Sequence, residues 1–141
     1  ISYSYLKTSR DYKDYPHRVM PYFASAHNLS VVYKQFISRL RTFVGMTYSF
    51  ASGRPYNDKN SDEFLSGRTK PYNDLSLNLT YLTSLFEREC IVHLGINNLL
   101  GFENVFGYRY AGTEGEDGLY ARQAIVPVTG RQAVLVFLIS L

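Results

Sequence analysis

The chain has 141 residues, enough for one domain, and a formal net charge of only +3 without a cluster of Lys and Arg, which excludes an obvious nucleic-acid partner. No apolar run reaches the roughly eighteen residues of a membrane-spanning helix, and the single cysteine, Cys90, excludes an internal disulfide. Thirteen Tyr and nine Phe, with no Trp, make the chain rich in aromatic residues. Tyr suits positions where apolar and wet surroundings meet.

Uncharged runs recur along the chain, separated by charged segments rich in turn-forming residues. In chain order they are Ile1–Leu6, Val19–Tyr33, Thr42–Gly53, Leu75–Phe86, Cys90–Phe102 and Gln132–Leu141. Within the runs apolar and polar residues alternate, as in "DLSLNLTY" at 74–81 and "VHLGIN" at 92–97. Alternation with period two predicts strands, and no helical period competes with it. We therefore expect an all-β fold, with an opening "ISYSYLK" that has the pattern of a strand interior and not of a signal peptide.

The connections between these runs alternate in length. Long polar segments at 7–18, 54–74 and 103–131 alternate with short ones at 34–39 and 87–89. This alternation is typical of a transmembrane β-barrel, which has long loops on one side of the membrane and short turns on the other. Runs of about ten residues also match the ~9–11 residues that a tilted strand needs to cross a bilayer. The sequence predicts an antiparallel meander of about six transmembrane strands, each paired with its neighbours in sequence.

The alternation also predicts which side chains face lipid and which face the barrel interior. The apolar set expected to face lipid is Leu75, Leu77, Leu79, Tyr81, Val92, Leu94, Ile96, Leu135, Phe137 and Ile139. The polar set expected to face the interior is Ser76, Asn78, Thr80, His93, Gly95 and Asn97.

The word PYND occurs twice, at Pro55–Asp58 and Pro71–Asp74. Proline ends strand pairing, and Asn-Asp favours turns, so the repeat predicts the two rims of one hairpin. A calcium loop is the alternative, because "DKNSDE" spaces Asp58, Asn60 and Asp62 as ligands. Glu63 stands where such a loop needs Gly, so this motif is broken, and we expect no metal site.

Two later segments carry a resemblance to a known family. "INNLLGFENVFGYRY" at 96–110 resembles the penultimate strand and following loop of TonB-dependent outer-membrane receptors. "VTGRQAVLVFLISL" at 128–141 is similar to their last strand, although the chain ends on Leu141 where these barrels usually end on an aromatic residue. "SGRPYND" and "YNDLSLNLTYL" resemble the branch of the family common in Bacteroidetes-type bacteria.

The resemblance implies a place within a larger protein. Residues 1–141 would be the C-terminal part of an outer-membrane barrel of about 22 strands, whose plug domain and other strands precede this chain. The implied partners are outer-membrane lipid, that plug, those strands and the inner-membrane TonB complex. The implied function is energy-coupled uptake of a scarce nutrient such as a siderophore, a metal complex or an oligomeric nutrient. A structural or adhesive barrel, or a passive pore, is the alternative, and a soluble β-barrel carrier is a weaker one.

An enzyme is not expected. His93 shares a face with Asn97, and Ser76 lies on the expected neighbouring strand, but these residues are also the ordinary lining of a polar barrel interior and no nucleophile motif accompanies them. No cofactor motif occurs either. If the chain is part of a receptor, its ligand contacts should lie in the long loops, where Tyr and Arg contribute most to binding. The ligand-binding candidates are Arg54, Tyr56, Tyr72, Arg109 and Tyr120.

Overall fold

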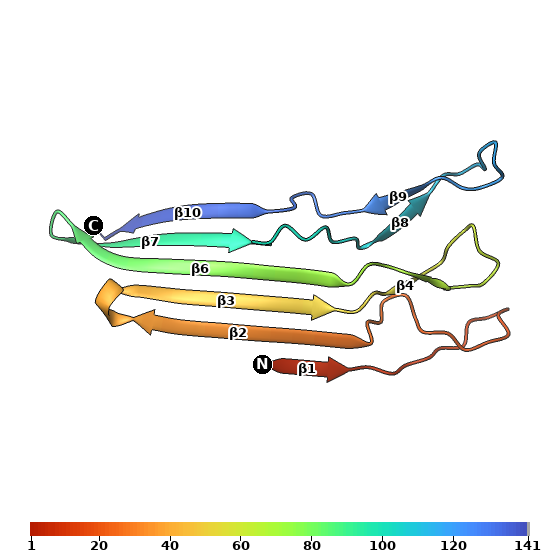
Figure 1. Cartoon of the computed structure of the whole chain (residues 1–141), viewed down its shortest axis with the longest axis horizontal. Helices are drawn as coiled ribbons and strands as arrows, with labels where there is room; N and C mark the ends of the chain where they lie inside the picture. The colour runs from red at the N-terminus through yellow and green to blue at the C-terminus, as the bar shows by residue number, and fades with distance from the viewer. Residues whose placement is uncertain (141) are drawn as a thin grey trace.

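The protein is an antiparallel β-sheet protein, as a computed structural model that describes residues 1–140 shows. Six strands form one sheet in the order β1-β2-β3-β6-β7-β10, and every neighbouring pair is antiparallel (Figure 1). The strands are β1 (Ser2–Tyr5), β2 (His27–Ile37), β3 (Thr42–Ala51), β6 (Tyr72–Leu85), β7 (Arg88–Asn97) and β10 (Gln132–Ile139). The predicted all-β meander is confirmed, and Leu141, the end of the last expected strand, lies outside the described residues.

The sheet is a single layer with no covering element. Figure 1 looks down the shortest axis of the molecule and shows the six strands side by side, with nothing packed over them. Among residues 1–140 the buried apolar residues are few and scattered: Pro21, Ala24, Pro55, Leu65 and Cys90. Phe137, in the last strand, is 63% exposed. The chain therefore folds without a hydrophobic core of its own, although soluble domains of this size normally have one.

The pairing register places the predicted apolar set on one face of the sheet. Leu79 lies opposite Leu94 of β7, which in turn lies opposite Leu135 of β10. On the other side of β6, Leu77 and Leu79 lie opposite Met46 and Val44 of β3. We call this side the apolar face, and the opposite side, which carries Ser76, Asn78, Thr80 and His93, the polar face.

The polar face is not uniform along the strands. Toward the short connections it becomes apolar, with the rings of Phe36 and Phe43 4.5 Å apart between centroids. Leu82, Ile91 and Leu138 are paired in register across β6, β7 and β10 on the same side. Phe36 is 41% exposed and Phe43 50% exposed, so this zone also lacks a covering layer.

Both short connections are tight turns, but one lies later than expected. Residues 34–37, which the sequence assigned to the first turn, continue strand β2, and the chain turns through the 3-10 segment η1 (Ser38–Leu40). Lys34 and Gln35 pair with Gly45 and Val44, because they lie inside a ladder that continues to Ile37 and Thr42, and this context outweighs their polarity. The second turn is confirmed near 86–89: Phe86 and Glu87, both at positive φ, join β6 to β7.

The long connections contain two further hairpins. Strands β4 (Pro55–Tyr56) and β5 (Gly67–Arg68) pair within one connection, and β8 (Gly107–Tyr110) pairs with β9 (Arg122–Ile125) within another. The prediction that the two PYND words mark the two rims of one hairpin therefore holds for the second word and is wrong for the first. Pro55 is inside the β4–β5 ladder, whereas Tyr72 begins β6 and pairs with Ala51. The first word lies beyond the end of the sheet and the second lies at it.

Both sides of the sheet end in an unpaired strand within residues 1–140. Strand β1 is one edge and β10 the other, and the six strands do not close on each other. No helix among these residues has the length and apolarity to cross a membrane.

Candidate functional site

The most elaborate side-chain arrangement lies at the long-connection end of the sheet, beyond the ends of β3 and β6. There the loop that contains β4 and β5 is hydrogen-bonded to the hairpin of β8 and β9, and Figure 1 draws both at the same end of the sheet. We call the meeting point the loop–loop contact. Its polar residues are Tyr56, Asp58, Lys59, Asn60, Tyr110, Tyr120 and Arg122.

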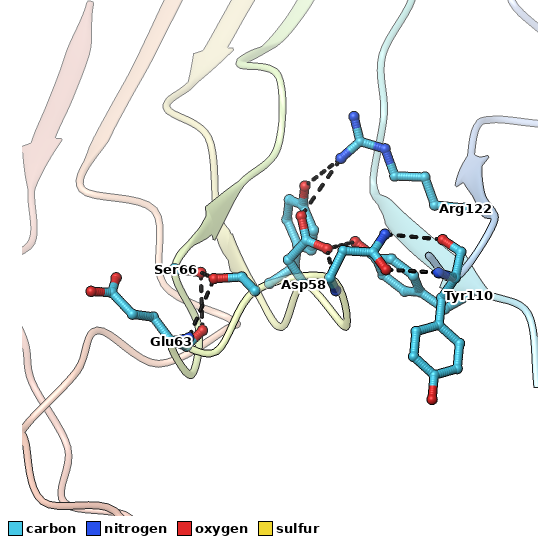
Figure 2. Close-up of polar contacts among 9 residues, drawn as sticks. Asp58, Glu63, Ser66, Tyr110 and Arg122 are labelled. Carbon is cyan, nitrogen blue, oxygen red and sulfur yellow. Dashed lines mark hydrogen bonds and ion pairs between the residues drawn. The ribbon is translucent and has the colours of Figure 1, made fainter. Parts of the chain in front are cut away.

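Asp58 is the central acceptor of this contact (Figure 2). The Tyr110 hydroxyl donates to Asp58 Oδ1 at 2.8 Å, and the backbone N–H of Asn60 donates to the same oxygen at 3.0 Å. Arg122 Nη1 lies 3.8 Å from Asp58 Oδ2 and donates to the Tyr56 hydroxyl at 3.1 Å. One carboxylate thus joins residues that are 52 and 64 positions away in sequence.

The hydrogen bonds also change the acidity of the two partners. The hydrogen bonds from Tyr110 and from the Asn60 backbone, assisted by the charge of Arg122, lower the pKa of Asp58 below its ordinary value of 3.8. Burial and the bond to Asp58 raise the pKa of Tyr110 from 10.0 to about 12. The contact is therefore built for a charged Asp58 and a neutral Tyr110 across a wide pH range.

Aromatic packing and a reciprocal amide pair reinforce the contact. The Tyr56 and Tyr108 rings lie 4.7 Å apart, and the Arg122 guanidinium lies over the Tyr108 ring at 5.0 Å. Asn60 Nδ2 donates to the Tyr120 carbonyl at 3.0 Å, while the Tyr120 N–H donates to Asn60 Oδ1 at 2.7 Å. The Asn60 side chain therefore pairs with Tyr120 as a backbone peptide would in a strand.

A cleft with a volume of about 270 Å³ lies beside this contact, where β3 ends and β6 begins. Arg54 and Lys70 contribute its cationic groups, and Tyr72, Val105 and Phe106 contribute ring and aliphatic surface. The Tyr72 and Phe106 rings stack with centroids 6.3 Å apart and planes 20° from parallel. Tyr72 shares the polar face of the sheet with Asp74, since its partner Ala51 is two residues from Ser49, the partner of Asp74.

Two buried asparagines fix the backbone around this cleft, and the sequence alone did not single them out. Asn104 Nδ2 donates to the Asn73 carbonyl at 2.7 Å, and the Asn73 N–H donates to Asn104 Oδ1 at 2.9 Å. Asn98, in the left-handed conformation with φ 50°, donates from Nδ2 to the carbonyls of Phe102 and Gly130. The recurrence of Asn in "INNLLGFEN" was the available signal, since Asn tolerates this conformation and bonds to backbone.

The structure separates the five predicted ligand-binding residues into three places. Arg54 and Tyr72 line the cleft. Tyr56 and Tyr120 belong to the loop–loop contact, where their polar groups already bind other parts of the chain. Arg109 lies on β8, away from the cleft lining.

The residues considered for a calcium loop and for a catalytic Ser–His pair make other contacts in the structure. Asp58 binds Tyr110, and the Glu63 side chain points away from it (Figure 2). No group of three His, Cys, Asp or Glu side chains that could hold a metal occurs among residues 1–140. His93 Nδ1 lies 2.8 Å from Thr80 Oγ1, and the Ser76 hydroxyl donates to Asp74, so no Ser–His pair forms.

Comparisons with models of protein families, with curated proteins and with solved structures found no match to this chain.

Proposed function

We propose that this chain is the C-terminal part of the transmembrane barrel of an energy-coupled outer-membrane receptor. The observation that carries the proposal is a single-layer antiparallel sheet with an apolar face that nothing covers. In water such a face would be strongly unfavourable, because each exposed apolar Å² costs about 25 cal/mol relative to burial. Lipid covers it without any further protein layer.

The dimensions of the sheet support a membrane location. Strands β2, β3 and β7 have 11, 10 and 10 residues, which match the ~9–11 residues of a membrane-crossing strand. All tight turns lie at one end and all long connections at the other, which is the arrangement of outer-membrane barrels.

Open edges support a larger barrel. Unpaired backbone groups at β1 and β10 are too costly in lipid, where each needs a hydrogen-bond partner. Six strands are also fewer than the eight of the smallest membrane barrels. Further strands, from outside residues 1–141, are therefore part of the proposal, and we assign the chain to the roughly 22-strand class on its sequence resemblance.

A plugged receptor is preferred to a passive pore because of the apolar zone on the polar face. In an open pore, Phe36, Phe43 and Leu138 would line water. In a plugged barrel they pack against the plug domain. The proposed energy source is the inner-membrane TonB complex, which would be reached through an N-terminal part that the proposal places before residue 1, and the proposed location is the outer membrane.

Uptake by the full-length protein tests the proposal. Cells that carry the intact gene should accumulate the nutrient, and a proton uncoupler should abolish the accumulation. A passive pore would continue to equilibrate the nutrient with uncoupler present, and an adhesive barrel would show the same uptake with the gene removed. Recovery of the full-length protein in the soluble fraction would contradict the membrane location itself.

Deletion of residues 59–69 tests the role of the outer loops in uptake. The deletion removes β5 and the Asn60–Tyr120 pair, and leaves Asp58, Lys70 and every residue of the six-strand sheet. We expect the variant to reach the outer membrane and to lose uptake. Unchanged uptake would make the β4–β5 loop a structural cap.

A further inference from the structure

The cleft lined by Arg54, which we call the Arg54 cleft, has two cationic lining residues without an ion-pair partner among residues 1–140. The ion pairs among residues 1–140 are Arg18–Asp11 and Arg122–Asp58, so neither Arg54 nor Lys70 pairs with a carboxylate in this part of the protein. Asp74, two residues from Tyr72 on the same face, is the acid to weigh against them, and it accepts the hydroxyl of Ser76 at 2.6 Å. Arg54 and Lys70 outnumber this one carboxylate, so the cleft offers net positive charge to a ligand.

Next to these cations lies a flat apolar wall. The stacked Tyr72 and Phe106 rings and the Val105 side chain form it, and Phe106 is 55% exposed. Flat rings bind the face of another ring, whether aromatic or a sugar, through their apolar surface. The cationic residues and the ring surface lie in one cleft. A ligand that contacts both is therefore a ring that carries a negatively charged group.

The backbone that carries Arg54 is held in place. Thr69, which is buried, donates its N–H to the Arg54 carbonyl at 3.0 Å and accepts the Arg54 N–H on its hydroxyl at 2.9 Å. Asn104 fixes the backbone at Asn73, next to Tyr72. A preformed site loses less conformational entropy when it binds a ligand.

The volume suits a small ligand group. At about 270 Å³ the cleft is slightly smaller than the roughly 300–1,000 Å³ that ligand pockets occupy, which is room for a single ring. We propose that the Arg54 cleft binds a carboxylate carried on a single six-membered ring, with Arg54 and Lys70 on the carboxylate and Tyr72 and Phe106 on the ring. The claim that this molecule is the nutrient of a receptor rests on the proposed function. The claim that it binds to the purified protein does not.

Titration calorimetry on the full-length protein in detergent, without the inner membrane, tests this site. The probes are galacturonate and benzoate, with galactose and benzyl alcohol as neutral partners of the same ring. We expect one anion to bind at least about tenfold more tightly than its neutral partner, since charged hydrogen bonds exceed neutral ones by this much. The anion that binds identifies the ring as a sugar or an aromatic. Equal affinities within both pairs, or no saturable binding of any probe, would overturn the proposal.

Two variants and one control assign the binding to these residues. The double variant R54Q/K70Q changes two exposed side chains, so its fold should persist, and we expect it to lose the preference for the anion. Tyr72→Leu should weaken both members of the preferred pair about tenfold through the lost ring contact. Arg39→Gln removes the same type of charge at the opposite end of the sheet and should change nothing. An unchanged preference in R54Q/K70Q would overturn the proposal even if uptake by the intact receptor is demonstrated.

Discussion

Side-chain amides act as backbone substitutes at several points of this chain. Asn60 and Asn104 each give and accept one hydrogen bond with a single backbone partner, Tyr120 and Asn73 respectively. Asn98 holds a turn in place in a similar way, because its side-chain amide donates to the carbonyls of Phe102 and Gly130. These residues hold irregular loops in one arrangement, which strand pairing does elsewhere in the molecule.

Tyr110 should ionise at a higher pH than the ordinary tyrosine value of 10.0. The raised pKa favours the neutral phenol, so the stability that the Tyr110–Asp58 bond supplies is complete below pH 10.0 and is lost as the pH rises through about 12. Subtracting the tyrosinate absorbance titration of a Tyr110→Phe variant from that of the unchanged protein should reveal one group with a pKa of about 12. If the group that Tyr110→Phe removes titrates near pH 10 instead, the Tyr110–Asp58 hydrogen bond is contradicted.

At acid pH the stability that this contact supplies depends on pH in the opposite direction, because Asp58 is the group that titrates there. The lowered pKa of Asp58 supplies stability above pH 3.8 that is lost only as the pH falls through the still lower value of the folded protein. Asp58→Asn is a control for the difference titration, because it removes the charged acceptor that, in addition to burial, raises the pKa of Tyr110. In that variant the late-titrating group should move toward its ordinary value.

Gly53 has no room for a side chain. A Cβ there would collide with the Thr69 backbone carbonyl, and Thr69 cannot retreat because it is hydrogen-bonded to Arg54 on both its N–H and its hydroxyl. We expect Gly53→Ala to cost about 1–3 kcal/mol, as overpacking usually does. Faster hydrogen exchange at the Thr69 amide would report the loss. Gly112→Ala, where a Cβ meets nothing within 4 Å, should leave exchange unchanged.

At the level of elements, the turn between β6 and β7 stores backbone strain. Phe86 and Glu87 adopt φ values of 51° and 62°, which are unfavourable for residues with a side chain. Replacing Glu87 with Gly should stabilise the folded chain by about 0.5–1 kcal/mol after the entropic cost of glycine. Urea unfolding in detergent micelles measures the change. The matched Glu89→Gly, inside strand β7, should destabilise, and a stabilising effect there would contradict the explanation.

The two faces of β6 should tolerate charge very differently. Leu79 lies on the apolar face between Val44 and Leu94, whereas Asn78 lies exposed on the polar face. Leu79→Arg should cost about 2–4 kcal/mol in a bilayer near the midplane, and Asn78→Arg little. Folding of the full-length variants into lipid vesicles, followed by urea titration, measures both. Equal costs would contradict the membrane assignment.

The strands and the two faces of the sheet were predictable from the sequence because the period-two pattern is strong in β3, β6 and β7. Strand ends were less so: polar residues Lys34 and Gln35 continue β2, since their partners in β3 are already in place. The hairpins inside the loops were not predictable, because β4 and β5 have only two residues each and β8 and β9 only four, too few for a period-two pattern. The loop–loop contact was not predictable either, because it joins residues more than 50 positions apart that no local pattern encodes. Arg54 and Tyr72 were chosen for their residue type, and only the fold brings them into one cleft.

On the scale of the whole molecule, the sheet is stabilised by its ladders and lacks an interior. Exposed rings and aliphatic side chains cover both faces of β10: Leu135 and Phe137 lie on one face and Val136 and Leu138 on the other. The unpaired edges of β1 and β10 add free backbone donors and acceptors.

Without lipid or detergent, the chain of 141 residues should therefore self-associate. We expect large assemblies in sedimentation velocity in aqueous buffer, and dispersed particles with a β-type circular dichroism spectrum in detergent micelles. The reason is that exposed apolar faces and open edges both find partners in other copies of the chain. A monodisperse monomer in plain buffer would show that the sheet tolerates water on both faces.

The loop–loop contact also constrains how such a protein can diversify. Asp58 with Tyr110 and Asn60 with Tyr120 join two surface loops that are 52 and 60 residues apart in sequence. A change of length or residue in one loop breaks bonds whose other halves lie in the second, so the loops form a single unit of variation. New specificities in this architecture would arise by exchanging both loops together, and substitutions at these paired positions would be inherited jointly.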